Sequence, residues 1–236
     1  MQKVRKIFTL FPSPTKHATL RVIFELQSPS PMQKIACFAV GVVLLCIVGC
    51  NDVKKLRTLA EQGNADAQFQ LGGRYCTGKG VPSDAVESIK WFRAAAEQGH
   101  AEAQGALASR YYYGIEGLLP EDKEEAAKWM RKSAEGGHGM GQLRLGDFYD
   151  KGEGVAEDKE EAVKWFRKAA EQEGPGQYSA MWRLGRCYYE GTGVPQDTAE
   201  AVKWLRKAEA GFKTQTTNLS GGNPATDLLQ EIEAKK

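Results

Sequence analysis

Two stretches of fifteen residues in this chain have nearly the same sequence. EDKEEAAKWMRKSAE occupies residues 121–135, and EDKEEAVKWFRKAAE occupies residues 157–171, 36 positions later. An active site is normally needed once, whereas a stackable structural unit has to be written repeatedly. Near-duplication at a fixed spacing therefore predicts a repeat array.

Two aromatic series show how far the array extends within the 236 residues. The tryptophans lie 38, 36 and 39 residues apart, and a series of tyrosines keeps step with them, which gives four units. The two series are Trp91, Trp129, Trp165 and Trp204, and Tyr75, Tyr111, Tyr149 and Tyr188. Each tyrosine ends an apolar stripe at i, i+4 and i+8, such as Ala67, Leu71 and Tyr75, which is typical of a helix face.

Each unit continues with a loop and a second helix. Three loops read Gly-x-Gly-Val, as at residues 78–81, where glycines can take the positive φ values that reverse the chain. The second loop, from Gly114 to Asp122, is two residues longer. Four aspartates, each three residues before a glutamate, predict capping boxes in which the aspartate caps the helix and the glutamate reaches back. These aspartates are Asp84, Asp122, Asp158 and Asp197, and Gly99, Gly137 and Gly211 are predicted to end second helices.

The four units share one combined pattern, which is clearest from Gly141 to Ala170: A-x-x-x-L-G-x-x-Y-x-x-G-x-G-V-x-x-D-x-x-x-A-x-x-W-x-x-x-A-A. This pattern resembles the Sel-1-like repeat family, relatives of the tetratricopeptide repeats. The resemblance covers residues 65–211. It implies an all-α fold, a right-handed α-solenoid of helix-turn-helix repeats with capping helices at its ends. We expect one cap within residues 50–64, around Leu56, Leu59 and Ala60. The other is expected after a polar linker in residues 212–236, starting at Asn223-Pro224.

Residues 1–49 are predicted to be a leader. Residues 35–49 form an uncharged run of fifteen after Lys34, short for a membrane span but typical of a signal-peptide core. The following Ile47-Val48-Gly49-Cys50 resembles a bacterial lipobox, which predicts lipidation of Cys50 and a periplasmic protein anchored to the inner or outer membrane. The alternative is a short buried helix that ends near a cysteine by chance.

The start of the chain leaves two interpretations open. Met32-Gln33-Lys34 would itself make a normal signal-peptide start, so translation begins at Met1 or at Met32. With Met1, residues 1–31 form a long n-region, or dual initiation yields exported and retained forms.

The net charge and the cysteine content exclude some classes of function and of covalent structure. The leader carries six basic residues and one acidic residue, so without it the formal net charge falls from +2 to −3, which argues against nucleic-acid binding. Cys76 and Cys187 lie three units apart, too far for a disulfide, and are predicted to be free, mostly buried thiols. An intermolecular bond between Cys76 residues is a minor alternative.

The sequence contains no pattern typical of catalysis, cofactor binding or metal binding. His100 and His138 each follow a helix-ending glycine at equivalent positions, which favours a structural role. GRYCTGKG at residues 73–80 is close to a P-loop, but Gly80 stands where the magnesium-binding hydroxyl belongs and the segment follows a helix.

Exposed positions of the first helices predict a partner-binding groove. Several of these positions are basic, which suits carboxylate-rich partners, and tyrosines at the adjoining edge could add aromatic contacts. An ordinary solvated face is the alternative for any single residue. The predicted groove residues are Gln70, Arg74, Arg110, Tyr112, Tyr113, Arg144, Asp147, Arg183, Arg186 and Tyr189.

These observations favour a lipid-anchored periplasmic solenoid that binds another protein. The resemblance further implies an immunity protein, because lipoprotein members of this repeat family include proteins that neutralise phospholipase toxins delivered by type VI secretion. The alternatives are a general envelope scaffold or signalling adaptor, and an enzyme acting on β-lactams like some cysteine-rich relatives. The missing cysteine framework and the lack of a nucleophile–base pair count against the enzyme.

Overall fold

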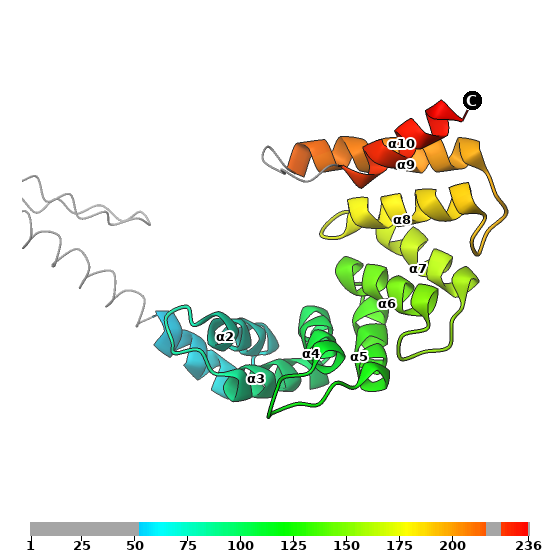
Figure 1. Ribbon diagram of the computed structural model, residues 1–236. Coiled ribbons are helices and arrows are strands. Elements are labelled where there is room, and N and C mark those ends of the chain that lie inside the picture. The colour runs from blue at the N-terminus through cyan, green and yellow to red at the C-terminus, as the bar shows by residue number, and fades with distance from the viewer. Residues whose placement is uncertain (1–51, 216–222, 236) are drawn as a thin grey trace, which may run out of the picture. The chain divides into compact units, whose positions relative to one another are not determined.

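The computed structural model describes residues 52–215 and 223–235, which all fall in one compact unit, Ile47–Lys236. Residues 1–49, with the predicted leader, and the predicted lipidation site Cys50 lie outside the described residues. None of the described helices is both long and apolar enough to cross a membrane. The elements are a helix at residues 52–61, α2 (Ala65–Thr77), α3 (Ala85–Glu97), α4 (Ala101–Tyr113), α5 (Lys123–Glu135), α6 (Gly139–Lys151), α7 (Lys159–Glu171), α8 (Gln177–Glu190), α9 (Thr198–Gln215) and α10 (Pro224–Ala234) (Figure 1).

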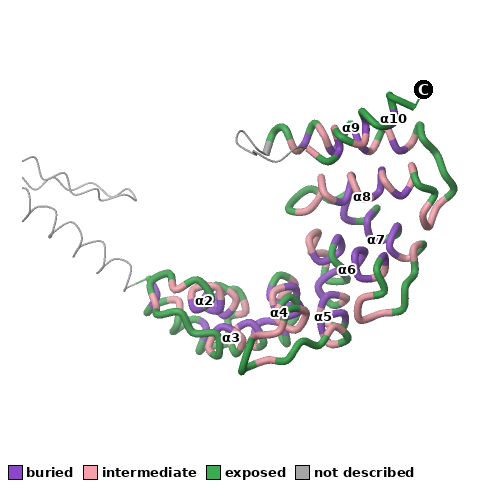
Figure 2. Tube along the Cα trace, viewed as in Figure 1, coloured by how far each residue is buried: buried purple, intermediate pink, exposed green. Residues whose placement is uncertain are grey.

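Consecutive helices pack in pairs, which confirms the predicted α-solenoid of four units. The pairs are α2–α3, α4–α5, α6–α7 and α8–α9, and each pair also contacts the next along the chain. The stripe leucines Leu71, Leu107, Leu145 and Leu184 are fully buried. Buried residues run along the sides of the helices that face their neighbours (Figure 2). Each buried leucine contributes roughly 2 kcal/mol to the free energy of unfolding.

The glycine after the stripe leucine allows the two helices of a unit to approach closely. A Cβ atom at Gly146 would lie 2.5 Å from Cε1 of Phe166, a fully buried ring on α7. Only glycine leaves room for that ring, so this position is set by packing and not by a turn.

Each predicted capping box forms one of its two hydrogen bonds, the one that the aspartate accepts. The Asp158 carboxylate accepts a hydrogen bond from the Glu161 N–H at 2.9 Å, and Asp84, Asp122 and Asp197 make the equivalent bond. The predicted return bond from the glutamate is wrong. The Asp158 N–H donates instead to the Tyr149 carbonyl at 3.0 Å, and Glu161 accepts from Lys164 at 2.9 Å. The loop has already satisfied the N–H that the glutamate would have reached.

An arginine that recurs before each first helix bonds to the stripe tyrosine of the unit that follows it. Arg93 on α3 donates a hydrogen bond to the Tyr111 hydroxyl on α4 at 2.7 Å, and Arg167 on α7 donates to Tyr188 on α8 at 2.6 Å. Arg57 with Tyr75 and Arg131 with Tyr149 repeat this contact. The tyrosine that ends each stripe therefore packs with its ring and links units with its hydroxyl.

Helices at both ends cover the array as predicted. Ala60, in the helix at residues 52–61, is buried against Ala67 and Leu71, although Leu59 is 39% exposed. At the other end the Asn223 side chain accepts from the Ala225 N–H at 3.0 Å and caps α10, with Pro224 in its first turn. Three apolar side chains of α10 pack on the last unit: Ala225, Leu229 and Ile232.

The prediction that Gly211 ends a helix is wrong. Helix α9 continues through Gly211 to Gln215. A Cβ atom at Gly211 would lie about 2 Å from the ring of Tyr178 on α8, so the glycine makes room for an aromatic ring. Gly99 and Gly137 have φ values of 89° and 86° and follow the ends of α3 and α5, as predicted.

Candidate functional site: the first-helix face

We call the side of α2, α4, α6 and α8 that lies away from their paired helices the first-helix face. Helix α4 contacts α6, α6 contacts α8, and α8 contacts α10. Positions on α4, α6 and α8 are therefore next to one another along this face, although they are far apart in the sequence.

The first part of the face differs from the predicted groove. Gln70 is exposed, but Arg74 donates to the Lys79 carbonyl in its own loop at 3.4 Å. Arg110 lies 2.7 Å from the Cys76 sulfur and lines a small hollow of about 80 Å³ beside the start of α3. These two arginines are thus turned toward the loops that join the first and second helices of the first two units.

The cysteine prediction holds in part. Cys76 and Cys187 are both free thiols. Cys187 is buried, and burial raises the pKa of its thiol to about 11. Cys76 is exposed, contrary to prediction, because it follows the buried stripe tyrosine and occupies the outer side of the last turn of α2.

Four predicted residues meet in a hollow between α4 and α6. The hollow has a volume of about 130 Å³, and Tyr112, Tyr113, Arg144 and Asp147 line it. The remaining lining residues were not predicted: Ser109, Met130, Phe148, Lys151 and Glu153. We call this feature the α4–α6 hollow.

The tyrosines of the hollow belong to an aromatic cluster. Tyr112 stacks on Phe148 with ring centroids 5.3 Å apart, and Tyr113 meets Tyr112 edge-on at 4.8 Å. The Tyr112 hydroxyl donates to the Glu153 carboxylate at 2.9 Å. That hydrogen bond, with burial, raises the pKa of Tyr112 to about 12.

Two aspartates on α6 face two arginines on α8. Asp147 Oδ1 lies 3.0 Å from Arg183 Nε, and Asp150 Oδ2 lies 3.4 Å from Arg186 Nη2. The Asp147 contact is a close ion pair without hydrogen-bond alignment. Burial raises the pKa of Asp147, while Arg183 and Arg144 oppose that shift. Arg183 and Arg186 therefore join α6 to α8, and we call the two pairs the aspartate–arginine ladder.

Asp150 is the member of the ladder that sequence reasoning missed. A usable signal was present, because Asp147 and Arg183 are 36 residues apart, as are Asp150 and Arg186, while the two units are offset by 39 residues from Tyr149 to Tyr188. Each arginine therefore lies three residues before the position equivalent to its aspartate, and opposite charges at this spacing meet when neighbouring units stack.

Tyr189, the last predicted residue, lies under the C-terminal helix. Its hydroxyl is 3.3 Å from Glu231 on α10 and 3.0 Å from Lys235, the C-cap residue of that helix. In this structure α10 therefore occupies the end of the first-helix face.

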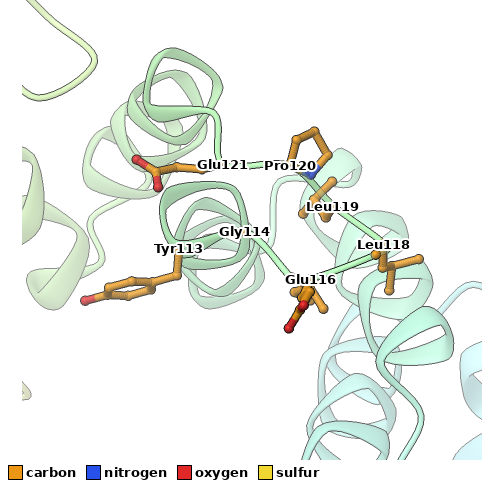
Figure 3. A pocket seen from close by; sticks show the side chains of 9 residues that line it. Tyr113, Gly114, Glu116, Leu118, Leu119, Pro120 and Glu121 are labelled. Atoms are coloured by element: carbon orange, nitrogen blue, oxygen red, sulfur yellow. The ribbon is translucent and has the colours of Figure 1, made fainter.

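The long second loop forms an open hollow of about 590 Å³ beside the face, lined by residues 113–121. An antiparallel bridge between Ile115 and Leu119 folds the loop back on itself. Tyr113 and Glu121 point to one side of the loop and Leu118 to the other (Figure 3). Tyr113 is 75% exposed and Leu118 is 42% exposed.

The two histidines in the described part of the chain occupy structural positions. The His100 Nδ1 accepts a hydrogen bond from the Ala103 N–H at 3.2 Å and caps α4. His138 Nδ1 lies 3.1 Å from the Ser133 hydroxyl, and burial lowers its pKa. Among the described residues, no group of three or more His, Cys, Asp or Glu side chains is placed to hold a metal ion. The chemistry of the first-helix face is that of ionic and aromatic contacts.

Comparison with known proteins identifies the repeat. The Sel1 repeat model matches residues 65–100, 101–138, 139–173 and 179–210. No curated protein matches the chain.

Three solved structures are similar to the chain. The Escherichia coli protein c5321, described as a protective antigen of uropathogenic strains displaying an SLR fold, is 42% identical, with a TM-score of 0.63 over 67% of this chain and 33% of that chain. A Sel1 repeat protein from Oxalobacter formigenes is 34% identical, with a TM-score of 0.65 over 76% of this chain and 48% of that one. The chain thus spans a third to about half of these relatives' length. The immunity protein Pa5087 from Pseudomonas aeruginosa is 19% identical with a TM-score of 0.46 over 68% of this chain and 57% of that one, a likeness that carries no functional argument.

Proposed function

The chain belongs to the Sel1 repeat family, and we propose that it is a lipid-anchored periplasmic protein, without catalytic activity, that binds another protein through its first-helix face. Sel1 repeat arrays are protein-interaction scaffolds. The observation that carries the proposal is the α4–α6 hollow, where exposed Tyr113 and Arg144 surround an aromatic cluster. Exposed aromatic and arginine side chains beside a small hollow are typical of the anchor points of protein interfaces.

The membrane anchor is proposed from the sequence. Ile47-Val48-Gly49-Cys50 follows an apolar run and offers one cysteine for lipidation. A clickable palmitate analogue should label the wild-type protein in bacterial cells and leave Cys50→Ser unlabelled. The mass of the mature protein should correspond to a chain starting at residue 50 plus the attached lipid. An unprocessed product would remove the anchor and the periplasmic location.

The partner is proposed to be a phospholipase toxin delivered by type VI secretion, which makes the protein an immunity protein. This step depends on the resemblance to lipoprotein Sel1 repeat proteins with that role. Co-expression with a phospholipase effector encoded next to the gene should restore growth, and Arg144→Glu should weaken both rescue and binding. If no neighbouring effector binds the protein or is neutralised by it, the immunity function is wrong and the general envelope scaffold becomes the better description.

A further inference from the structure

The α4–α6 hollow has the size and lining of a socket for one side chain. Its volume of about 130 Å³ is well below the roughly 300 Å³ at which sites for small-molecule ligands begin. Met130 and Phe148, both at most 5% exposed, supply its apolar surface, and Tyr112 and Tyr113 form an aromatic wall. An added ring could continue the stacked and edge-on contacts that Tyr112 already makes with Phe148 and Tyr113.

The carboxylates around the hollow have close cationic partners, whereas the cations have few close carboxylates. The Glu153 carboxylate accepts from Tyr112 and lies 3.8 Å from Lys123, while Asp147 is paired with Arg183. Both carboxylates thus have cations outside the hollow.

The two cations of the hollow keep most of their charge available. The Arg144 side chain is 55% exposed and reaches Asp147 only at 3.7 Å, while Arg183 is closer at 3.0 Å. Lys151 has no carboxylate within ion-pair distance in the part of the chain that is described. The rim therefore presents positive charge to a partner at Arg144 and Lys151, while its two carboxylates are already in contact with other cations.

We propose that the α4–α6 hollow accepts an aromatic side chain of a partner protein that is flanked by carboxylates, with the ring against Tyr112 and Phe148 and the carboxylates at Arg144 and Lys151. This inference rests on the proposed function and names the chemistry of the partner segment. An aromatic anchor supplies contact area at low entropic cost, and the flanking charges fix its orientation.

The test uses the full-length protein in detergent micelles and fluorescein-labelled peptides of glycine and serine that carry one central triad. The triads are Glu-Phe-Glu, Glu-Ala-Glu and Lys-Phe-Lys, and fluorescence anisotropy measures binding. Glu-Phe-Glu should bind saturably with a Kd below about 1 mM. It should bind about tenfold more tightly than either of the other two.

Reversing one charge of the protein, together with the charges of the peptide, tests whether the two interact directly. Arg144→Glu should weaken Glu-Phe-Glu binding about fivefold and strengthen Lys-Phe-Lys binding by a similar factor. Lys79→Glu, with the same charge change in the exposed loop after α2, should alter neither affinity. Unchanged circular dichroism melting would show that both variants are folded.

Three results would overturn the inference: no saturable binding of Glu-Phe-Glu, equal binding of Glu-Ala-Glu, or equal binding of Lys-Phe-Lys. A protein that still binds and neutralises its toxin while the peptides show no selectivity would refute this inference alone. Failure to bind any neighbouring effector would refute the proposed immunity function, whatever the peptides do.

Discussion

The junction between α4 and α6 and the junction between α6 and α8 use the same helix positions in opposite ways. Counted from the stripe tyrosine, Ser109 and Tyr112 on α4 occupy the positions of Asp147 and Asp150 on α6. The helix that follows presents Arg144 and Asp147 to the first pair, and Arg183 and Arg186 to the second. Ion pairs therefore close one junction, while a serine and a tyrosine leave a hollow at the other.

This difference shows how a repeat array gains a specific site without changing its fold. The buried stripe is nearly the same in these units, and the longer loop after α4 leaves the stacking of the helices unchanged. Positions outside the stripe are free to vary. One pair of units becomes a rigid joint, and its neighbour becomes a candidate socket.

The largest expected effect comes from breaking the closed junction. Arg183→Met leaves the Asp147 carboxylate, 8% exposed, without its closest cation and should lower the free energy of unfolding by about 2 kcal/mol at pH 7. Arg144→Met, at the equivalent position of the hollow, should cost less than about 0.5 kcal/mol because its side chain is 55% exposed. Urea unfolding of the two variants measures the difference. Equal costs would mean that the ladder does not stabilise the α6–α8 junction.

Removing the aspartate caps should affect both sides of the hollow alike. Asp122→Ala and Asp158→Ala each remove one cap hydrogen bond and should each cost about 1 kcal/mol. Thermal unfolding followed by circular dichroism measures both. A clearly larger loss at one cap would show that the two units differ in more than the residues facing the junction.

A smaller effect is expected from the hydroxyl in the hollow. Tyr112→Phe removes the hydrogen bond to Glu153 and should cost about 0.5 to 1 kcal/mol at pH 7. Because the pKa of Tyr112 is raised above its unfolded value of 10.0 to about 12, its stabilising effect is present below pH 10 and lost as the pH rises through about 12. Urea unfolding of both proteins across this range measures the change. A constant difference between them would contradict the assignment.

The smallest expected effect is a gradual change of the free energy of unfolding with pH, caused by Asp147. Burial raises the pKa of Asp147 above its ordinary value of 3.8, so the folded state favours the protonated carboxyl. That contribution is fully present below the unfolded pKa and is lost as the pH rises through the folded pKa. The free energy of unfolding of wild type should therefore fall relative to Asp147→Asn from about pH 4 upward. A difference that does not change with pH would contradict the raised pKa.

Local sequence patterns predicted most of the fold. The stripe at Leu145, the cap at Asp158 and the cap at Asn223 each depend on residues within one or two helical turns, so spacing and residue type suffice to place them. The failed predictions have a different origin. Gly211 lies within α9 because Tyr178 needs its space, and the return bond from Glu161 is absent because the Tyr149 carbonyl already occupies the Asp158 N–H.

The sequence by itself determined the repeat length, the four units and the side of each helix that is buried, because these follow from side-chain periodicity within a unit. The tertiary structure alone decided which arginines stay available: Arg183 and Arg186 pair with aspartates one unit earlier, while Arg144 remains exposed. It also placed the hollow between α4 and α6. Contacts between units depend on how closely neighbouring helices approach, and that distance is set by packing across the whole stack.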